Sequence, residues 1–145
     1  MRGFDPAASG DGKYMPQYGT LNGNPIAAAA GLATLEILRE PGTYDRLFAT
    51  GEQLMAGVQS AFDAVGIAIQ VVGAPPVFDV FFTDQKITSY RDTLTSDKTM
   101  VTQFNRQLLD RGIFRPDSKF YVSIMHSAED VARTIEVFAA AAKTL

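Results

Sequence analysis

Cysteine is absent from the 145 residues, and histidine occurs once, at His126. The lack of cysteine excludes disulfides, thiolate metal ligands and a cysteine nucleophile, and it leaves the redox compartment undetermined. No metal site is predicted. No apolar run reaches the roughly 18 residues of a membrane-spanning helix, and the first residues lack the apolar core of a signal peptide. We therefore expect a cytoplasmic protein that does not enter a membrane.

An excess of charge of one sign is also missing. The 13 basic and 16 acidic residues give a net charge of −3 and are mixed along the chain. This pattern lacks the basic patch of a nucleic-acid-binding protein and the basic face of a membrane-surface protein. With 46% hydrophobic residues, the chain is long enough to form one domain with its own core.

The start of the chain differs in character from the rest. Residues 1–18 contain glycine, proline and small polar residues without the period of a helix or a strand. We interpret residues 1–24 as an irregular arm that ends in a glycine-bearing turn. Residues 25–145 are interpreted as one small domain that includes a long linking helix. An arm of this length is unusual ahead of a domain and fits the end of a longer connection.

Helices are predicted from apolar spacing and from the residues at their ends. Asn24 and Pro25 suit the cap and the first position of a helix over residues 25–40. Apolar residues three and four apart predict a second helix over residues 43–65, with Thr43 as its cap. These two helices are separated by a proline and a glycine, which break helical structure.

The second half of the chain predicts two further helices. One covers residues 96–111, because apolar residues recur on one face and a glycine follows. The other begins after Ser127, which forms a capping-box pattern with Asp130 three residues later.

Strands are predicted between these helices from β-branched and aromatic residues. The two longer strands cover residues 67–72 and 77–83, and the short proline-containing break between them favours an antiparallel pair. Shorter strands are predicted over residues 113–115 and 120–124. The order of elements indicates an α+β fold, with a small, mostly antiparallel sheet and helices packed on one face.

The turn at residues 19–24 precedes the first helix and is the strongest local feature. Gly19 and Gly23 allow the backbone to bend sharply, and Thr20 places a hydroxyl donor beside the main-chain N–H groups. This combination suits either a phosphate-like anion or simply a well-capped helix with a flexible entry. No Walker-type lysine follows the glycines, which argues against a nucleotide-binding loop.

The Gly-Thr-Leu-Asn-Gly-Asn-Pro sequence of residues 19–25, followed by an alanine-rich helix, resembles a known family. It is similar to the segment that opens the C-terminal part of class III pyridoxal-phosphate-dependent aminotransferases. Within this class it is nearest to the glutamate-1-semialdehyde 2,1-aminomutases. The similarity covers nearly the whole chain and recurs, in the same order, in residues 41–44, 78–83, 108–114 and 126–130. The resemblance also implies the small C-terminal domain of fold-type I enzymes.

The resemblance implies pyridoxal 5′-phosphate as the cofactor and a homodimer as the assembly. In the family, the threonine of the turn and its neighbouring main chain donate to the cofactor phosphate of the other subunit. Carried onto this chain, the cofactor-binding residues are Thr20 and Gly19. The lysine and the carboxylate that hold the cofactor lie upstream in the family, on a large N-terminal domain. None of the five lysines has the matching context, so we expect no catalytic residue here and an inactive isolated chain.

Three other side chains are candidates for chemistry. His126 has no clustered carboxylate or second histidine in the sequence, so a structural role is favoured. Arg115 is a candidate contact for a substrate carboxylate, because guanidinium groups match carboxylates in geometry, and Arg91 has the same chemistry. The chain departs from the aminomutases at residues 118–121, where Ser-Lys-Phe-Tyr lacks the glutamate of the family's Ser-x-Phe-Glu. The substrate therefore stays open.

The sequence predicts the C-terminal part of an aminomutase or aminotransferase that acts on a small amino acid or amino-aldehyde. For an aminomutase, the reaction would be an isomerisation in tetrapyrrole precursor synthesis. Two alternatives stay open. One is another class III transaminase, for example one that acts on a β- or ω-amino acid. The other is a non-catalytic domain for binding or dimerisation, which would self-associate through the alanine-rich first helix.

Overall fold

The computed structural model describes residues 19–145, and the predicted arm of residues 1–18 lies outside them. The chain divides into two compact units between Glu40 and Pro41. Of the first unit, residues 19–40 are described. Among the described residues, no helix combines the length and the apolar character needed to cross a membrane.

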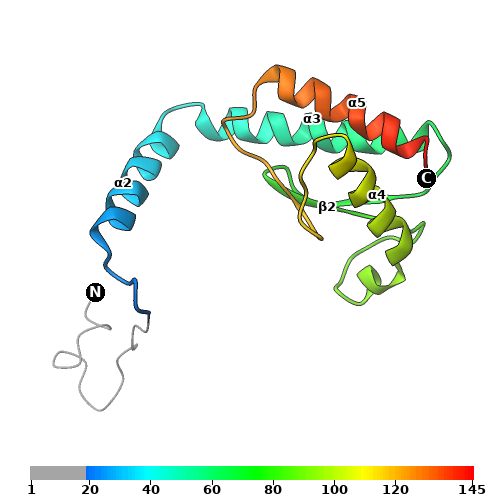
Figure 1. The fold of residues 1–145 in the computed structure, drawn as a ribbon, viewed down its shortest axis with the longest axis horizontal. Coiled ribbons are helices and arrows are strands. Elements are labelled where there is room, and N and C mark those ends of the chain that lie inside the picture. Colours follow the sequence, from blue (N-terminus) through cyan, green and yellow to red (C-terminus); the bar gives the residue numbers. More distant parts are fainter. Residues whose placement is uncertain (1–18) are drawn as a thin grey trace, which may run out of the picture. The chain divides into compact units, whose positions relative to one another are not determined.

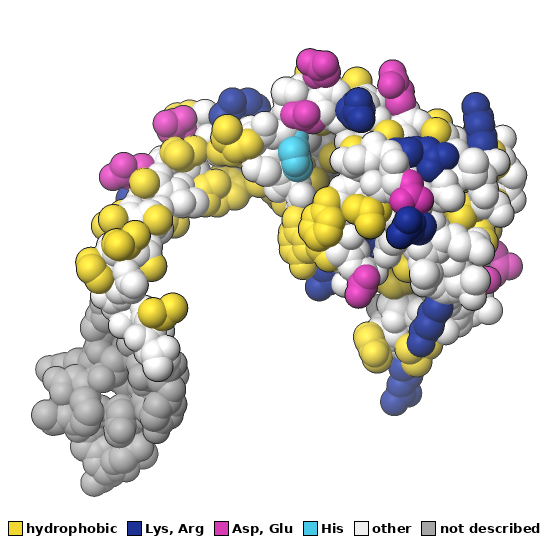
Figure 2. Space-filling model, in the orientation of Figure 1, with side chains coloured by type: hydrophobic (Ala, Val, Ile, Leu, Met, Phe, Trp, Pro, Cys, Tyr) yellow, Lys and Arg dark blue, Asp and Glu magenta, His cyan; other side chains and the backbone are white. Residues whose placement is uncertain are grey.

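The first unit contains helix α2 (Pro25–Arg39), which begins where the sequence predicts. The Asn24 side chain accepts hydrogen bonds from the N–H groups of Ile26 and Ala27, and Pro25 stands at the first helical position. None of the residues of α2 is buried. Hydrophobic side chains lie along its surface (Figure 2), and Leu32 is 64% exposed. Taken by itself, the described part of the first unit therefore buries none of the apolar side chains of this helix.

The second unit is an α+β fold, as the sequence predicts. Its helices are α3 (Thr43–Asp63), the 3-10 helix η2 (Asp92–Thr95), α4 (Lys98–Asp110) and α5 (Ala128–Ala142). Its antiparallel sheet has the order β1 (Gln70–Ala74), β2 (Val77–Phe81) and β3 (Phe120–Tyr121). Figure 1 shows α3 and α5 side by side on one side of the sheet, and these two helices make extensive contacts.

The central strand β2 is paired over only part of one edge. Phe78 is opposite Phe120, the first residue of β3, so β2 has no strand partner on this edge beyond Phe78. Further along the same edge, where no strand pairs with β2, main-chain N–H groups donate to side chains instead. The N–H of Val80 donates to the Asp79 carboxylate at 2.8 Å, and the N–H of Phe82 donates to Ser96 Oγ at 2.9 Å. These bonds satisfy the main-chain N–H groups of two buried residues that have no strand partner on this edge.

Phenylalanine rings form the centre of the core. Phe104 is fully buried, and its ring lies 5.2 Å from that of Phe62 and 6.1 Å from that of Phe138, between centroids. Phe78 stacks on Phe120 at 4.9 Å. Because these rings come from all three long helices and two strands of the unit, the core ties the elements together.

Helix α3 lies close to the turn between β1 and β2 at Gly51. A Cβ placed there would lie 2.0 Å from the carbonyl oxygen of Pro75, in the turn between β1 and β2. Any larger residue would push the helix off this turn. The α-carbon of Gly51 therefore sets the distance between α3 and the hairpin.

The structure corrects several of the predicted elements. Residues 113–115 form no strand, because the N–H of Ile113 bonds back to Leu108 O at the end of α4. The first strand begins later than predicted and includes Gly73, and the last strand has only two residues. Helix α3 is capped by Gly42, in a left-handed conformation, whereas the prediction had assigned the cap to Thr43.

Candidate functional site

The turn ahead of α2 is closed by its own main chain. The N–H of Asn22 donates to Gly19 O, and the N–H of Asn24 donates to Leu21 O, both at 3.1 Å. Gly23 has φ +75°, a left-handed conformation that favours glycine. The same Asn24 then caps the helix with its side chain. The turn is therefore shaped by main-chain bonds and glycine, as its sequence indicates.

Thr20 lies exposed on this turn. Its hydroxyl makes no hydrogen bond to any residue between 19 and 145. The N–H groups of Ile26 and Ala27 at the start of α2, in contrast, already donate hydrogen bonds to the Asn24 side chain. A ligand at this turn would therefore meet the Thr20 hydroxyl and the turn's main chain rather than the bare end of a helix.

In the second unit, Arg115 is buried and has two polar partners. It is 8% exposed, and its two terminal nitrogens donate to Asp79 of β2 and to the side-chain oxygen of Asn105 on α4. The guanidinium also lies over the ring of Phe120, 4.6 Å from its centroid. Burial lowers the pKa of Arg115, and the charge of Asp79 opposes that shift.

This ion pair was not predicted from the sequence, although the position of Asp79 indicates that it needs a partner of opposite charge. It is the only charged residue in the otherwise apolar strand Val-Phe-Asp-Val-Phe. An ionised group among buried residues requires a partner of opposite charge. Arg115 supplies that charge from a segment 36 positions away. The predicted role of Arg115 as a substrate contact stays a prediction, and a substrate carboxylate there would compete with Asp79.

The other sequence candidates lie on the surface. His126 is exposed, and its Nδ1 accepts the N–H of Ser123 at 3.2 Å. This bond closes the chain just before α5 and agrees with a structural role. Arg91 is exposed at the start of η2. Within the described part of the chain, no group of three or more histidine, aspartate or glutamate side chains could hold a metal ion.

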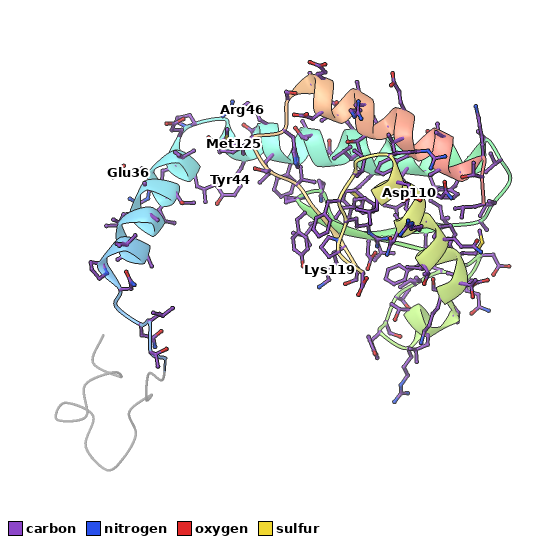
Figure 3. All side chains as sticks on the ribbon, viewed as in Figure 1. Glu36, Tyr44, Arg46, Asp110, Lys119 and Met125 are labelled. Carbon is purple, nitrogen blue, oxygen red and sulfur yellow. The ribbon has the colours of Figure 1, made fainter. Side chains whose placement is uncertain are left out.

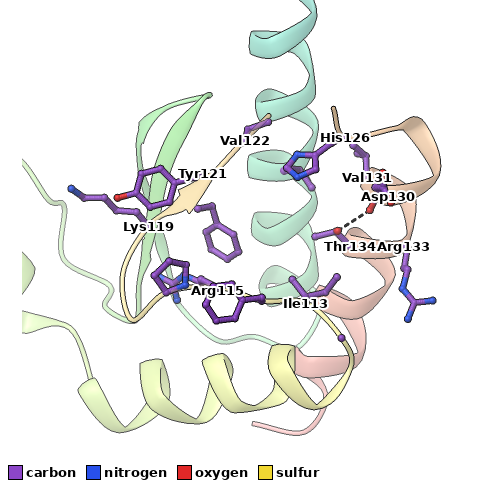
Figure 4. Close-up of a pocket in the computed structure, with 15 residues that line it drawn as sticks. Ile113, Arg115, Lys119, Tyr121, Val122, His126, Asp130, Val131, Arg133 and Thr134 are labelled. Atoms are coloured by element: carbon purple, nitrogen blue, oxygen red, sulfur yellow. Dashed lines mark hydrogen bonds between the residues drawn. The ribbon is translucent and has the colours of Figure 1, made fainter. Parts of the chain in front are cut away.

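A cavity of about 480 Å³ lies between residues 112–122 and the first turns of α5. Figure 4 shows Ile113, Val122 and Val131 around it, with His126 at one end. Arg115 also contributes to its lining. The cavity therefore lies between the loop that carries Arg115 and the start of α5, which follows His126.

Known proteins resemble the chain in sequence and in structure. No protein-family model matches it. A glutamate-1-semialdehyde 2,1-aminomutase of Thermus thermophilus is 41% identical over 124 residues, which cover 83% of this chain and 29% of that protein. The ω-transaminase of Sphaerobacter thermophilus has a TM-score of 0.84 and 30% identity, over 98% of this chain and 32% of that one.

A glutamate-1-semialdehyde aminomutase of Pseudomonas aeruginosa shares the fold. Its TM-score is 0.74 at 20% identity, over 90% of this chain and 30% of that one. The chain spans about a third of the length of these relatives. In sequence and in fold, it therefore matches a portion of the class III pyridoxal-phosphate-dependent aminotransferases, as its Gly-Thr-Leu-Asn-Gly-Asn-Pro segment predicts.

Proposed function

We propose that the chain is the C-terminal part of a pyridoxal-phosphate-dependent enzyme that transfers amino groups, resembling glutamate-1-semialdehyde 2,1-aminomutase. The observation that carries this proposal is the 41% identity to that enzyme in Thermus thermophilus, over most of this chain. The substrate would be a small amino acid or amino-aldehyde, as in tetrapyrrole precursor synthesis. The lysine that holds the cofactor would lie on a large domain upstream, so the isolated chain would be inactive.

The chemistry of the turn fits one contact to pyridoxal phosphate. Thr20 has an exposed hydroxyl without a partner among the described residues, and Gly19 lies beside it. A hydroxyl that donates to a phosphate stabilises binding by about 1.5 to 3 kcal/mol. When bound, the cofactor supplies an electron sink for chemistry at the amino-bearing carbon. The contribution of this chain would be to hold the phosphate.

We further propose a cytoplasmic homodimer, and the exposed side chains of α2 support the dimer. Its first eleven residues carry no charge, and none of its residues is buried. A helix with this surface is stabilised by a packing partner rather than by water. Light scattering on the protein tests the assembly. A strictly monomeric species would contradict the proposed dimer.

Reading the source DNA upstream of the Met1 codon tests the proposal directly. An open frame that encodes a long α/β segment with a lysine near its end would support the enzyme. A stop codon just upstream would overturn it. In that case α2, with no buried residue, favours the second candidate, a stand-alone dimerisation or binding domain.

The role of Thr20 is tested in the full-length protein encoded there. Thr20→Val is expected to weaken cofactor retention about tenfold, because one charge-assisted hydrogen bond is lost. Thr34→Val is the matched control, since the Thr34 hydroxyl donates to Ala30 O within α2. Equal cofactor affinity in both variants would show that Thr20 does not contact the cofactor.

A separate experiment distinguishes the aminomutase from other class III transaminases. It measures steady-state activity of the full-length protein with a panel of amino donors.

A further inference from the structure

The turn ahead of α2 contains the only Asn-Gly pair in the sequence, Asn22-Gly23. Both residues are exposed. The turn lies at the opposite end of α2 from Glu36 (Figure 3). In an Asn-Gly pair the main-chain nitrogen after the asparagine can attack the side-chain amide most readily, because glycine has no Cβ to shield that nitrogen or to restrict the backbone.

The main-chain nitrogen of Gly23 is not engaged in the turn. The N–H groups of Asn22 and Asn24 donate to Gly19 O and Leu21 O, whereas that of Gly23 donates to none of residues 19–145. Apart from its neighbours in the chain, no atom lies within 4 Å of the position that a Cβ of Gly23 would take. The nitrogen that would react is therefore neither hydrogen-bonded nor crowded.

The side-chain amide of Asn22 is also free. It makes no hydrogen bond within the described part of the chain. It is folded against Gly19, where a Cβ would lie 2.8 Å from Asn22 Oδ1. Because Gly19 has no Cβ, the amide fits there without a bond that holds it. Rotation of this side chain towards Gly23 would therefore break no hydrogen bond to the described residues.

The other two asparagines lack these features. Asn24 is followed by Pro25, whose nitrogen carries no hydrogen and cannot attack, and the Asn24 side chain caps α2. Asn105 lies within helix α4, and its side chain accepts a hydrogen bond from Arg115. Both residues can therefore serve as internal controls for the reactivity of Asn22.

We propose that Asn22 is a modification site at which the chain spontaneously loses an amide. The Gly23 nitrogen forms a bond to Asn22 Cγ, the Cγ–Nδ2 bond breaks, and ammonia leaves with the proton of the attacking nitrogen. Water then opens the cyclic succinimide at either carbonyl, which gives aspartate or isoaspartate and one new negative charge. Water is the only co-reactant, so this chemistry is independent of amino-group transfer.

The new charge would appear beside the proposed phosphate contact. The Asn22 side chain lies against Gly19, which precedes Thr20 in the turn. A carboxylate there repels a phosphate. Isoaspartate also lengthens the main chain, which disturbs the bond from the N–H of Asn24 to Leu21 O. We therefore expect converted chains to hold pyridoxal phosphate less tightly, a consequence that rests on the proposed function.

Ageing the purified full chain without cofactor tests the chemistry. Peptide mapping by mass spectrometry should find aspartate and isoaspartate at position 22, while Asn24 and Asn105 remain amides. The rate should rise with pH, because the attacking nitrogen must lose its proton. It should stay within about tenfold of the rate in a free peptide of residues 19–25, since an exposed turn opens at little cost. A slower rate, or equal conversion of Asn105, would overturn the proposal.

Two variants separate the attacking nitrogen from the amide. Asn22→Gln keeps an amide but has to close a larger ring, and Gly23→Ala shields the nitrogen with a methyl group. Each should slow the loss of ammonia at least about tenfold. Gly31→Ala is the control, because no asparagine precedes Gly31 in α2, and it should leave the rate unchanged. If Gly23→Ala loses helicity by circular dichroism, Asn22→Gln decides alone. Conversion of Asn22→Gln at the wild-type rate would contradict the succinimide.

The consequence for the cofactor is measured in the full-length protein. Asn22→Asp introduces the charge without lengthening the main chain, and it should hold pyridoxal phosphate at least about threefold more weakly than the neutral Asn22→Gln. Equal retention by these two variants, in a protein that holds the cofactor, would show that the charge does not act on the phosphate. A wild-type protein that holds no cofactor would contradict the proposed function instead, and the result of the ageing experiment would still stand.

Discussion

Arg115 forms an ion pair with Asp79 that connects the loop after α4 to the middle of strand β2. Their side chains are 1% and 15% exposed, respectively. The pair lies near the point where β3 begins, beyond which this edge of β2 has no strand partner. Because Arg115 also donates to Asn105, the same guanidinium fixes α4, β2 and the loop relative to one another.

Removing this arginine should destabilise the fold strongly. Arg115→Met leaves the Asp79 charge partly buried and unpaired, and we expect a loss of about 3 kcal/mol in the free energy of unfolding. Urea denaturation measures it. Arg106→Met is the control, because the Arg106–Asp110 pair is 70% and 46% exposed and should contribute less than about 1 kcal/mol. Similar losses in both variants would mean that Arg115 is not structurally important.

Gly51→Ala tests the close approach of α3 to the hairpin. The new methyl group would lie 2.0 Å from the main-chain oxygen of Pro75, which has little freedom to move. We expect the free energy of unfolding to fall by about 2 kcal/mol or more. Gly31→Ala, in α2, meets no atom within 4 Å and should instead raise helicity by circular dichroism. Unchanged unfolding of Gly51→Ala would mean that the helix can shift freely.

The loop before α4 should contribute to acid sensitivity through Asp92. Its carboxylate accepts hydrogen bonds from the N–H and hydroxyl of Thr88 and the N–H of Ser89. Hydrogen bonds from Thr88, then Ser89, lower its pKa from 3.8 to about 2. A folded-state pKa below the unfolded value gives stability that is present above pH 3.8 and lost as the pH falls towards about 2.

Asp92→Asn should therefore flatten the dependence of unfolding on pH within that window. Denaturation curves at several pH values measure the slope. Asp84→Asn is the control, since Asp84 is an exposed loop carboxylate without a hydrogen bond in the described residues. Parallel pH profiles for wild type and Asp92→Asn would show that the Thr88 and Ser89 bonds do not form in solution.

Ser127→Ala should loosen the start of α5. The Ser127 hydroxyl oxygen accepts the N–H of Asp130 at 3.1 Å, and alanine leaves this donor without a partner. Loss of such a cap costs about 1 kcal/mol. Thr134→Ala removes a hydroxyl that only donates to a main-chain oxygen within α5, so its effect should stay within about 0.5 kcal/mol. Hydrogen exchange of the first turn of α5 would report the difference, and equal protection in both variants would argue against the cap.

Local signals predicted the helices well. Asn24 with Pro25, and Ser127 with Asp130, act over three or four residues, and the structure forms both caps as expected. The Gly-Thr-Leu turn was also identified from the sequence alone. Its hydroxyl donor, Thr20, is exposed as a phosphate contact requires, while its role stays a prediction. Short-range rules suffice wherever the interacting residues are neighbours in the chain.

Long-range pairing explains what the sequence could not predict. Residues 113–115 have the composition of a strand, yet Arg115 is held by Asp79 and Asn105 instead of by a strand partner. The position of β1 was missed because Gly73 and Ala74, which read as part of a break, pair with Phe78 and Val77. The cavity beside α5 was also missed, since its walls come from three separate segments.

The unpaired edge of β2 has a consequence for association. Exposed strand edges recruit strands from other molecules and lead to fibres. Here the N–H of Val80 is bonded to Asp79, and Phe82 uses its N–H for Ser96 and its carbonyl for the N–H of Asp97. An incoming strand would find these groups occupied and a charged side chain in its path. This part of the β2 edge is therefore protected against amyloid-like growth.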